Sequence, residues 1–132
     1  MTDANQPTFS TVQLPIAHDL LAPDGSEIRV LVGTARASLA HGLLPPGAVS
    51  KAIRHRTVEE IWYVLAGRAA IWRRLDDDEQ VIKATAGTSP TIPVGTHFQF
   101  RTLGDEPFQF IMFTMPPWPG EDEAEFIEGI WE

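Results

Sequence analysis

The sequence predicts an all-β barrel or sandwich, and three observations point to this class. Short runs of strand-forming residues recur at spacings of roughly 8–12 residues, with turn residues between them. The chain has 10 Gly and 11 Pro among its 132 residues, which favours many turns. No long segment has the apolar periodicity of an amphipathic helix. A chain of this length is expected to form one domain with its own core.

Residues 1–27 are expected to form an N-terminal arm with one edge strand. Residues 1–9 show no periodicity, whereas residues 10–14 alternate and predict a strand that Pro15 ends. The run Pro23-Asp24-Gly25-Ser26 predicts a turn before the next strand.

Residues 28–115 are expected to form the barrel. The strongest strand signal covers residues 59–66, which are apolar on both faces, so both faces are expected to be covered. The acidic run at 76–79 predicts a solvated hairpin tip. The other expected strands cover residues 28–32, 36–44, 48–55, 68–74, 80–84, 87–94, 97–102 and 108–115.

The net charge of −8 is concentrated in the last quarter of the chain. Acids and bases balance up to Arg101, and no Lys or Arg follows it. Acidic charge repels phosphate backbones and anionic membranes, so neither nucleic acid nor a membrane surface is an expected partner. Residues 116–132 form an acidic tail that also contains Trp118 and Trp131. A tail with two Trp residues is expected to dock, either as a lid or against a second subunit.

The chain has no Cys, which excludes disulfides, thiolate nucleophiles and thiolate metal sites. Its first residues lack the basic and apolar regions of a secretory signal. Both features fit an expected cytoplasmic location.

Two stretches carry motifs with a recognisable order and gap. The first begins at Gly47, holds His55 and Glu60, and closes at Gly67. The second begins at Gly87 and continues with Pro93-Val94-Gly95-Thr96-His97-Phe98-Gln99-Phe100. Together they resemble the paired motifs of the cupin family, a resemblance that extends over about residues 28–115. It implies a double-stranded β-helix, or jelly-roll, barrel in a small single-domain protein that is commonly a homodimer.

The resemblance also implies a metal site, from which this sequence departs. Cupins typically hold Fe, Mn, Zn, Ni or Cu with three His and one Glu, a donor set suited to such divalent ions. His55 and Glu60 match two of these positions, and both are also candidate catalytic residues. Ile53 stands where the first His is expected, which removes that ligand.

The third His depends on strand register. Counting from Pro93 and Gly95 places Phe98 in the ligand column, whereas the His-Phe-Gln phrase of germin-type cupins places His97 there. A one-residue shift moves a strand side chain to the opposite face, so the two alternatives give two or three ligands. In the second register Arg101 also faces the cavity and would bind a carboxylate substrate.

The expected substrate pocket is apolar with a few polar groups, as is usual for small-molecule sites. Its expected lining consists of Ile53, Trp62, Phe98, Arg101, Phe110 and Met112.

Three functions are compatible with these residues. The favoured one is a small-molecule-binding cupin with a degenerate metal site at His55, Glu60 and His97. One alternative is a metal-dependent isomerase, decarboxylase or oxygenase, in which the metal acts as a Lewis acid. The other is a structural or interaction dimer with a filled barrel.

Overall fold

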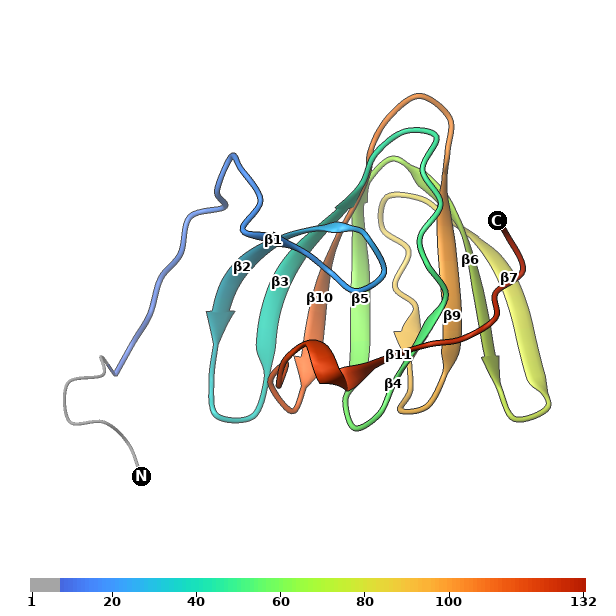
Figure 1. Ribbon diagram of the computed structural model, residues 1–132. Helices are drawn as coiled ribbons and strands as arrows, with labels where there is room; N and C mark the ends of the chain where they lie inside the picture. Colours follow the sequence, from blue (N-terminus) through green and yellow to red (C-terminus); the bar gives the residue numbers. More distant parts are fainter. Residues whose placement is uncertain (1–7) are drawn as a thin grey trace.

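The computed structural model describes residues 8–132, which form two antiparallel sheets facing each other across a barrel (Figure 1). The first sheet has the order β1-β2-β3-β10-β5-β8 and the second the order β11-β4-β9-β6-β7. The first sheet consists of β1 (Leu20–Leu21), β2 (Glu27–Gly33), β3 (Ser38–Leu44), β10 (Phe108–Met115), β5 (Glu59–Ala66) and β8 (Thr91–Ile92). The second consists of β11 (Ala124–Phe126), β4 (Ile53–His55), β9 (His97–Leu103), β6 (Arg68–Leu75) and β7 (Asp78–Ala84). The predicted double-stranded β-helix barrel is confirmed.

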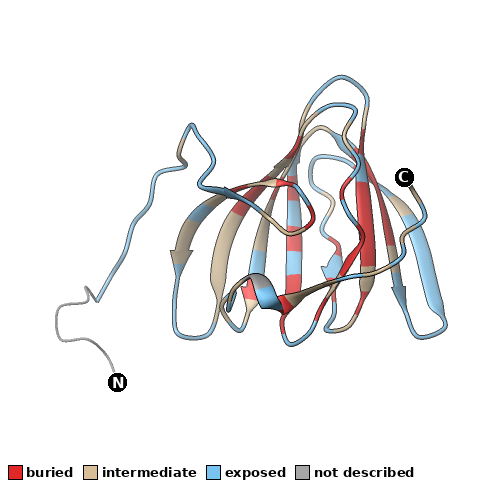
Figure 2. Ribbon diagram, in the orientation of Figure 1, coloured by how far each residue is buried: buried red, intermediate tan, exposed pale blue. Residues whose placement is uncertain are grey.

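Strand β5 shows how the sequence produces this fold. Its residues alternate between buried and exposed along the whole strand, because successive side chains point to opposite faces (Figure 2). Trp62 and Val64 point inward and pair in register with Met112 and Phe110 of β10. The predicted boundaries of this strand, residues 59–66, are confirmed.

The barrel interior is filled with aromatic rings. Trp62 stacks on Phe110 with ring centroids 4.2 Å apart, and Phe98 and Phe100 meet the Trp62 ring edge-on. Such pairs each add about 0.5–1.5 kcal/mol beyond the burial of their area. Residues from both sheets therefore meet in one core, which fixes the distance between the two sheets.

The acidic tail docks along the second sheet, as predicted. A short 3-10 helix, η1 (Glu121–Glu123), leads into β11, which pairs with β4. The buried Glu123 carboxylate accepts hydrogen bonds from the N–H and hydroxyl of Thr57 and from the N–H of Val58. Further along, the side chain of Gln99 bonds to the backbone of Trp131 at 2.8 and 3.0 Å. The tail is thus hydrogen-bonded to the β4–β5 turn through Glu123, an interaction called the Glu123 clasp below, and then covers part of β9.

Several strand predictions differ from the structure. Residues 10–14 form no strand, because the alternating segment has no neighbouring strand with which to pair. Of residues 48–55 only Ile53–His55 form a strand, and of residues 87–94 only Thr91–Ile92 do so. The described chain also leaves the outer face of β5 uncovered, contrary to the expectation that both faces are buried.

Candidate functional site at the mouth of the barrel

His55 lies inside the barrel mouth at the end of β4. Alternation along this three-residue strand turns Ile53 and His55 inward and Arg54 outward. The imidazole packs edge-on against Phe98 and against Trp118 of the tail, with ring centroids 5.3 Å apart in each case. Its Nδ1 atom is buried and has no hydrogen-bond partner. Burial lowers the pKa of His55, and the nearby carboxylates of Asp24 and Glu123 only partly oppose that effect, so the ring is neutral at pH 7.

Glu60 lies on the facing sheet and is 4% exposed. The indole Nε1 of Trp62 donates to its Oε1 at 3.0 Å, and the hydroxyl of Thr114 donates to its Oε2 at 2.8 Å. Burial raises the pKa of Glu60, while these two hydrogen bonds pull the pKa back toward its usual range. Both carboxylate oxygens are therefore already engaged by protein donors.

A third buried ionisable group, Asp24, was not identified from the sequence. It lies in the turn between β1 and β2 and accepts hydrogen bonds from the N–H and hydroxyl of Ser26 at 2.8 and 2.6 Å. Burial raises the pKa of Asp24, and the charges of Glu60 and His55 are near enough to influence it. The Pro-Asp-Gly-Ser run predicted a turn but not its burial, since nothing in the local pattern shows that Asp24 is buried near His55 and Glu60.

The residues at the mouth do not fit a three-ligand metal centre. Ile53 occupies the position of one expected ligand, and both oxygens of Glu60 are bonded to Trp62 and Thr114. Across residues 8–132, no group of three or more His, Cys, Asp or Glu side chains is arranged to hold an ion. His55 and Glu60 are thus the two inward-facing members of the predicted set.

The prediction that His97 is the third ligand is wrong. Phe98 pairs in register with Ile53 and points inward, so the preceding residue points out of the barrel. His97 instead pairs with Arg54 and Arg74, and its Nδ1 lies 3.2 Å from the Arg74 guanidinium. Burial, and then the charges of the Arg74 and Arg54 guanidinium groups, lower the pKa of His97.

The residues expected to line a substrate pocket belong instead to the core. Four of them are at most 1% exposed, and Met112 packs against the same cluster from a partly buried position. The four are Ile53, Trp62, Phe98 and Phe110. The aromatic rings described above occupy the space that a ligand would need.

Arg101 also differs from its predicted role. It is exposed on the outer face of β9, and its guanidinium lies over the Trp131 ring at 4.9 Å from the centroid. This cation–π contact helps to hold the tail on the barrel. A carboxylate ligand in the barrel would not reach Arg101.

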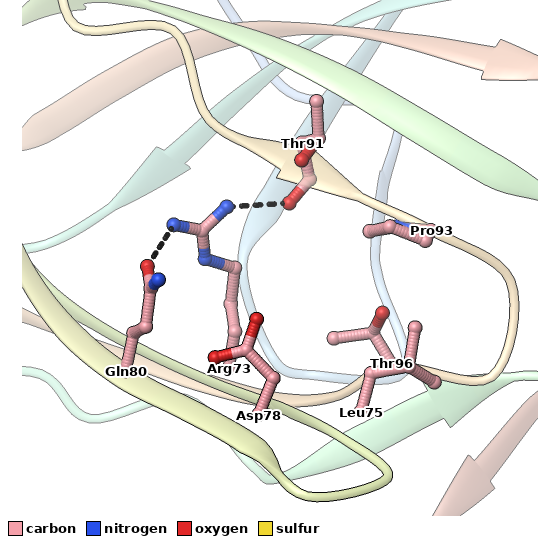
Figure 3. Close-up of a pocket in the computed structure, with 7 residues that line it drawn as sticks. All are labelled: Arg73, Leu75, Asp78, Gln80, Thr91, Pro93 and Thr96. Carbon is pink, nitrogen blue, oxygen red and sulfur yellow. Dashed lines mark hydrogen bonds between the residues drawn. The ribbon is translucent and has the colours of Figure 1, made fainter.

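A separate polar pocket of about 340 Å³ lies between β6, β7 and β8 (Figure 3). Arg73 faces into the barrel, since it pairs in register with the inward-facing Phe98. Its guanidinium donates to the Thr91 carbonyl at 2.8 Å and to Gln80 Oε1 at 3.2 Å. The remaining lining residues are Leu75, Asp78, Pro93 and Thr96.

Thr96 is the most informative residue of this pocket. It is 2% exposed, yet its hydroxyl has no hydrogen-bond partner. Gly95, the residue before it, donates to the His55 carbonyl at 3.2 Å, so the pocket adjoins the strand that carries His55. The sequence did not identify this pocket, because Arg73 and Arg74 are adjacent and only the register decides which one faces inward.

The described chain is thus a small β-barrel of two facing antiparallel sheets, with one His and one Glu buried at its mouth. A model of the cupin domain matches residues 40–114, and the chain belongs to this family.

Two curated relatives are similar to most of the chain. The uncharacterized protein MJ1618 of Methanocaldococcus jannaschii is 31% identical over 113 residues, which cover 82% of this chain and 86% of that protein. The alginate biosynthesis protein AlgA of Pseudomonas fluorescens is 29% identical over 113 residues. These residues cover 86% of this chain but 22% of AlgA, so the match concerns one part of a longer protein.

Solved structures share the fold. The capsular polysaccharide assembling protein CapF of Staphylococcus aureus aligns with a TM-score of 0.69 and 22% identity, over 92% of this chain and 33% of CapF. An oxalate decarboxylase of Bacillus subtilis, whose Mn(II) centres have been studied, aligns with a TM-score of 0.64 and 20% identity. That alignment covers 80% of this chain and 28% of the decarboxylase. At these identities the likeness establishes the cupin fold.

In the described part of the chain, no helix has the length and apolar character needed to cross a membrane.

Proposed function

We propose that this cupin binds a small, uncharged, hydroxyl-rich molecule of the sugar or polyol class in the pocket between β6, β7 and β8. The observation that carries the proposal is Thr96, which lines that pocket and whose buried hydroxyl has no protein partner. A buried polar group without a partner costs free energy, and a ligand hydroxyl would remove that cost.

The lining of the pocket favours hydroxyl groups over a free carboxylate. Arg73 and Asp78 bring opposite charges, Gln80 brings an amide, and Thr96 brings a hydroxyl. Such a mixture contains both hydrogen-bond donors and acceptors, which matches groups that can donate and accept. The Asp78 carboxylate would repel an anionic ligand, and the Arg73 guanidinium is already bonded to Thr91 and Gln80.

The volume of the pocket supports a ligand of the size of one sugar ring. Its roughly 340 Å³ lies at the small end of the range of about 300–1,000 Å³ seen for ligand sites. AlgA, which is named for alginate biosynthesis, gives a reason to begin with sugars.

Binding, rather than metal-dependent catalysis, is the function that the site supports best. His55 and Glu60 are both buried and lie on facing sheets, but aromatic rings flank His55 and protein donors occupy Glu60. A general acid or base has to reach the proton that it transfers, either directly or through one water molecule. Elemental analysis per subunit tests the metal-dependent alternative, and near-stoichiometric metal lost in a His55→Ala variant would favour that alternative.

The direct test is ligand-observed NMR with free hexoses, polyols and hexuronates as probes. We expect binding of hexoses or polyols to the wild type, weaker binding of hexuronates, and at least tenfold weaker hexose or polyol binding in Thr96→Val and Arg73→Met variants, the loss expected when a buried ligand hydrogen bond is removed. Arg74→Met is the matched control, because this neighbouring Arg points out of the barrel. The proposal fails if no neutral probe binds, or if the Thr96→Val and Arg73→Met variants bind as well as the control.

A further inference from the structure

Three basic side chains stand next to one another on the outer face of the second sheet. Strands β11, β4, β9, β6 and β7 lie side by side in this sheet (Figure 1). Arg74 of β6 pairs in register with His97 of β9, which pairs in turn with Arg54 of β4. These three side chains are called the basic row below. Glu79 of β7 pairs with Arg74 and Glu125 of β11 pairs with Arg54, so each end of the basic row has an acid beside it.

The basic row lines a surface pocket of about 430 Å³. The other lining residues come from the end of β6, the β6–β7 turn and the loop before β9, and they are Leu75, Asp76 and Gly95. This pocket lies on the opposite face of β6 from the pocket proposed for sugars, because the adjacent Arg73 and Arg74 point to opposite faces. It is therefore a second candidate site with a different set of polar groups.

Arg74 and His97 present hydrogen-bond donors to this pocket. The Arg74 guanidinium lies 3.2 Å from Nδ1 of His97. A guanidinium has no acceptor, so Nδ1 accepts this bond and the neutral ring carries its proton on Nε2. The lowered pKa described above keeps that ring neutral at pH 7. The remaining N–H groups of Arg74 and the Nε2–H of His97 are thus left for a ligand.

The charges of the two Arg residues are incompletely paired. The Nε atom of Arg54 is buried without a hydrogen-bond partner, and Glu125 Oε2 lies 3.6 Å away, which is too far to accept one. The same oxygen lies 3.3 Å from Nη1 of Arg56, so one carboxylate is shared by two guanidinium groups. Among the side chains that the structure describes, no carboxylate forms an ion pair with Arg74, Glu79 included.

The Trp72 ring helps to hold Arg74 in position. The Cζ atom of Arg74 lies over this ring, 5.9 Å from its centroid, in a cation–π contact. Trp72 is 2% exposed, so the guanidinium rests on a fixed support. Stacking uses the face of a guanidinium and leaves its N–H edge free for an oxyanion.

We propose that the basic row binds a phosphate group, either as inorganic phosphate or as the phosphate of a small phosphomonoester. Arg54 and Arg74 flank the neutral His97 ring, so an anion over His97 would lie between two positive charges. A phosphate has at least three acceptor oxygens and can bond to several donors at once. This inference goes beyond the proposed sugar site and does not depend on it.

Asp76 and the pocket volume favour phosphate over sulfate and other anions. A carboxylate only accepts hydrogen bonds, and a phosphate that carries a proton can donate to it, whereas sulfate at neutral pH cannot. The volume of about 430 Å³ leaves room for a small organic group attached to the phosphate. Nucleic acid does not fit as the source of the phosphate, because the chain carries a net charge of −8.

The first test is isothermal titration calorimetry at constant ionic strength, with inorganic phosphate and methyl phosphate as probes. We expect saturable binding of inorganic phosphate with a Kd of roughly 1 mM or tighter, and weaker binding of sulfate. Arg74→Met should weaken phosphate binding at least tenfold, the loss expected when a hydrogen bond to a charged group is removed. Arg54→Met is a second variant with the same direction of change. Unchanged circular dichroism confirms that the variants are folded.

Arg73→Met is the matched control, because it removes the same charge from the adjacent residue on the opposite face of β6. It should leave phosphate binding within about twofold of the wild type, as expected for a charge outside the site. The same two variants separate this inference from the proposed function, since sugar binding should be lost in Arg73→Met and kept in Arg74→Met. Methyl phosphate distinguishes the sources. Binding of methyl phosphate supports a phosphomonoester, and binding of inorganic phosphate alone supports the free ion.

The second test locates the anion by NMR of the His ring protons during a phosphate titration. The His97 signals should shift with the Kd measured by calorimetry, and the pKa of His97 should rise, because a neighbouring anion favours the imidazolium. His18 is the internal control, since its ring lies beside Glu27 of β2 in the first sheet. Its signals should not follow the phosphate concentration.

Four results would overturn the inference. The first is the absence of saturable phosphate binding to the wild type. The second is sulfate binding as tight as that of phosphate, which would indicate a general cationic surface. The third is an equal loss of phosphate binding in Arg74→Met and Arg73→Met. The fourth is phosphate binding that leaves the His97 signals unmoved.

Discussion

The indole of Trp118 lies edge-on against the imidazole of His55, with ring centroids 5.3 Å apart. One ring comes from the first sequence motif and the other from the tail, so residues far apart in the chain close the barrel mouth together. The backbone N–H of Trp118 also donates to the Ser38 hydroxyl at 3.2 Å, which links the tail to the start of β3. The tail is therefore part of the site.

Replacing Trp118 is expected to change the titration of His55. Burial is the main cause that lowers the pKa of His55, so Trp118→Ala should let that pKa rise toward its ordinary value of 6.5. Trp118→Phe, which keeps an aromatic cover, should change it less. NMR titration of the His55 ring protons measures both variants, and an identical pKa in Trp118→Ala and wild type would show that the tail does not shield the ring.

The Glu123 clasp is expected to stabilise the fold in a pH-dependent way. Burial alone would raise the pKa of Glu123, but hydrogen bonds from Thr57 and Val58 outweigh it and hold the pKa below 4.5. The unfolded chain therefore takes up its proton first as the pH falls. The contribution of the charged group is complete above about pH 4.5 and is lost as the pH falls through the folded pKa.

Glu123→Gln should therefore lower the free energy of unfolding by about 2 kcal/mol at pH 7 and by much less near pH 3. Urea denaturation at the two pH values checks this expectation. Glu128→Gln, at an exposed position of the same tail, is the control and should have little effect at either pH. Equal losses for both variants would contradict the role of the clasp.

Restoring the missing ligand position should create metal affinity. Ile53 points inward beside His55 and opposite Phe98, so Ile53→His would add a third donor to His55 and Glu60. Without metal the variant should be less stable by about 1–3 kcal/mol, because a polar imidazole ring replaces a buried aliphatic side chain. With Ni²⁺ or Zn²⁺ the thermal midpoint should recover.

A double variant is the control for the recovery of the thermal midpoint by Ni²⁺ or Zn²⁺. The double variant Ile53→His with His55→Ala should show no recovery, because it again has only two donors. Recovery in the double variant would mean that the added ions bind elsewhere on the chain.

Gly67 is expected to be irreplaceable at the end of β5. Its φ of +77° is unfavourable for other residues, and a Cβ at this position would collide with the carbonyl of Pro107. Gly67→Ala should cost well over the 1–2 kcal/mol that a left-handed backbone alone costs. Gly47, with a φ of +74° and open space around it, isolates the backbone effect, so Gly47→Ala should cost about 1 kcal/mol. Similar losses in thermal denaturation for both would refute the steric argument.

The sequence predicted the barrel well where patterns are local. Runs of apolar, β-branched and aromatic residues predicted strands at residues 59–66 and 108–115 with the observed boundaries. The paired motifs supplied the family, and the two Trp residues of the tail predicted that it docks.

Predictions failed where the answer depended on contacts between distant segments. Nothing local decides whether His97 or Phe98 faces inward, because both fit an alternating strand. The pairing of Phe98 with Ile53 turns Phe98 inward, and this pairing between β4 and β9 exists only in the folded barrel. Arg73, Asp24 and Thr96 were missed for the same reason, since their burial follows from neighbours that the chain supplies far away in sequence. Residues 10–14 alternate like a strand, but a strand also needs a partner.

The clasp between Glu123 and Thr57 has a consequence for the newly made chain. Glu123 is synthesised 66 residues after Thr57, so the turn between the His55 and Glu60 strands cannot form its final hydrogen bonds until residue 123 has left the ribosome. Until then, His55 lacks its Trp118 cover and the barrel mouth stays open to solvent. A ribosome that stops before this point would release a chain with an exposed apolar opening, the kind of surface that chaperones and proteases recognise.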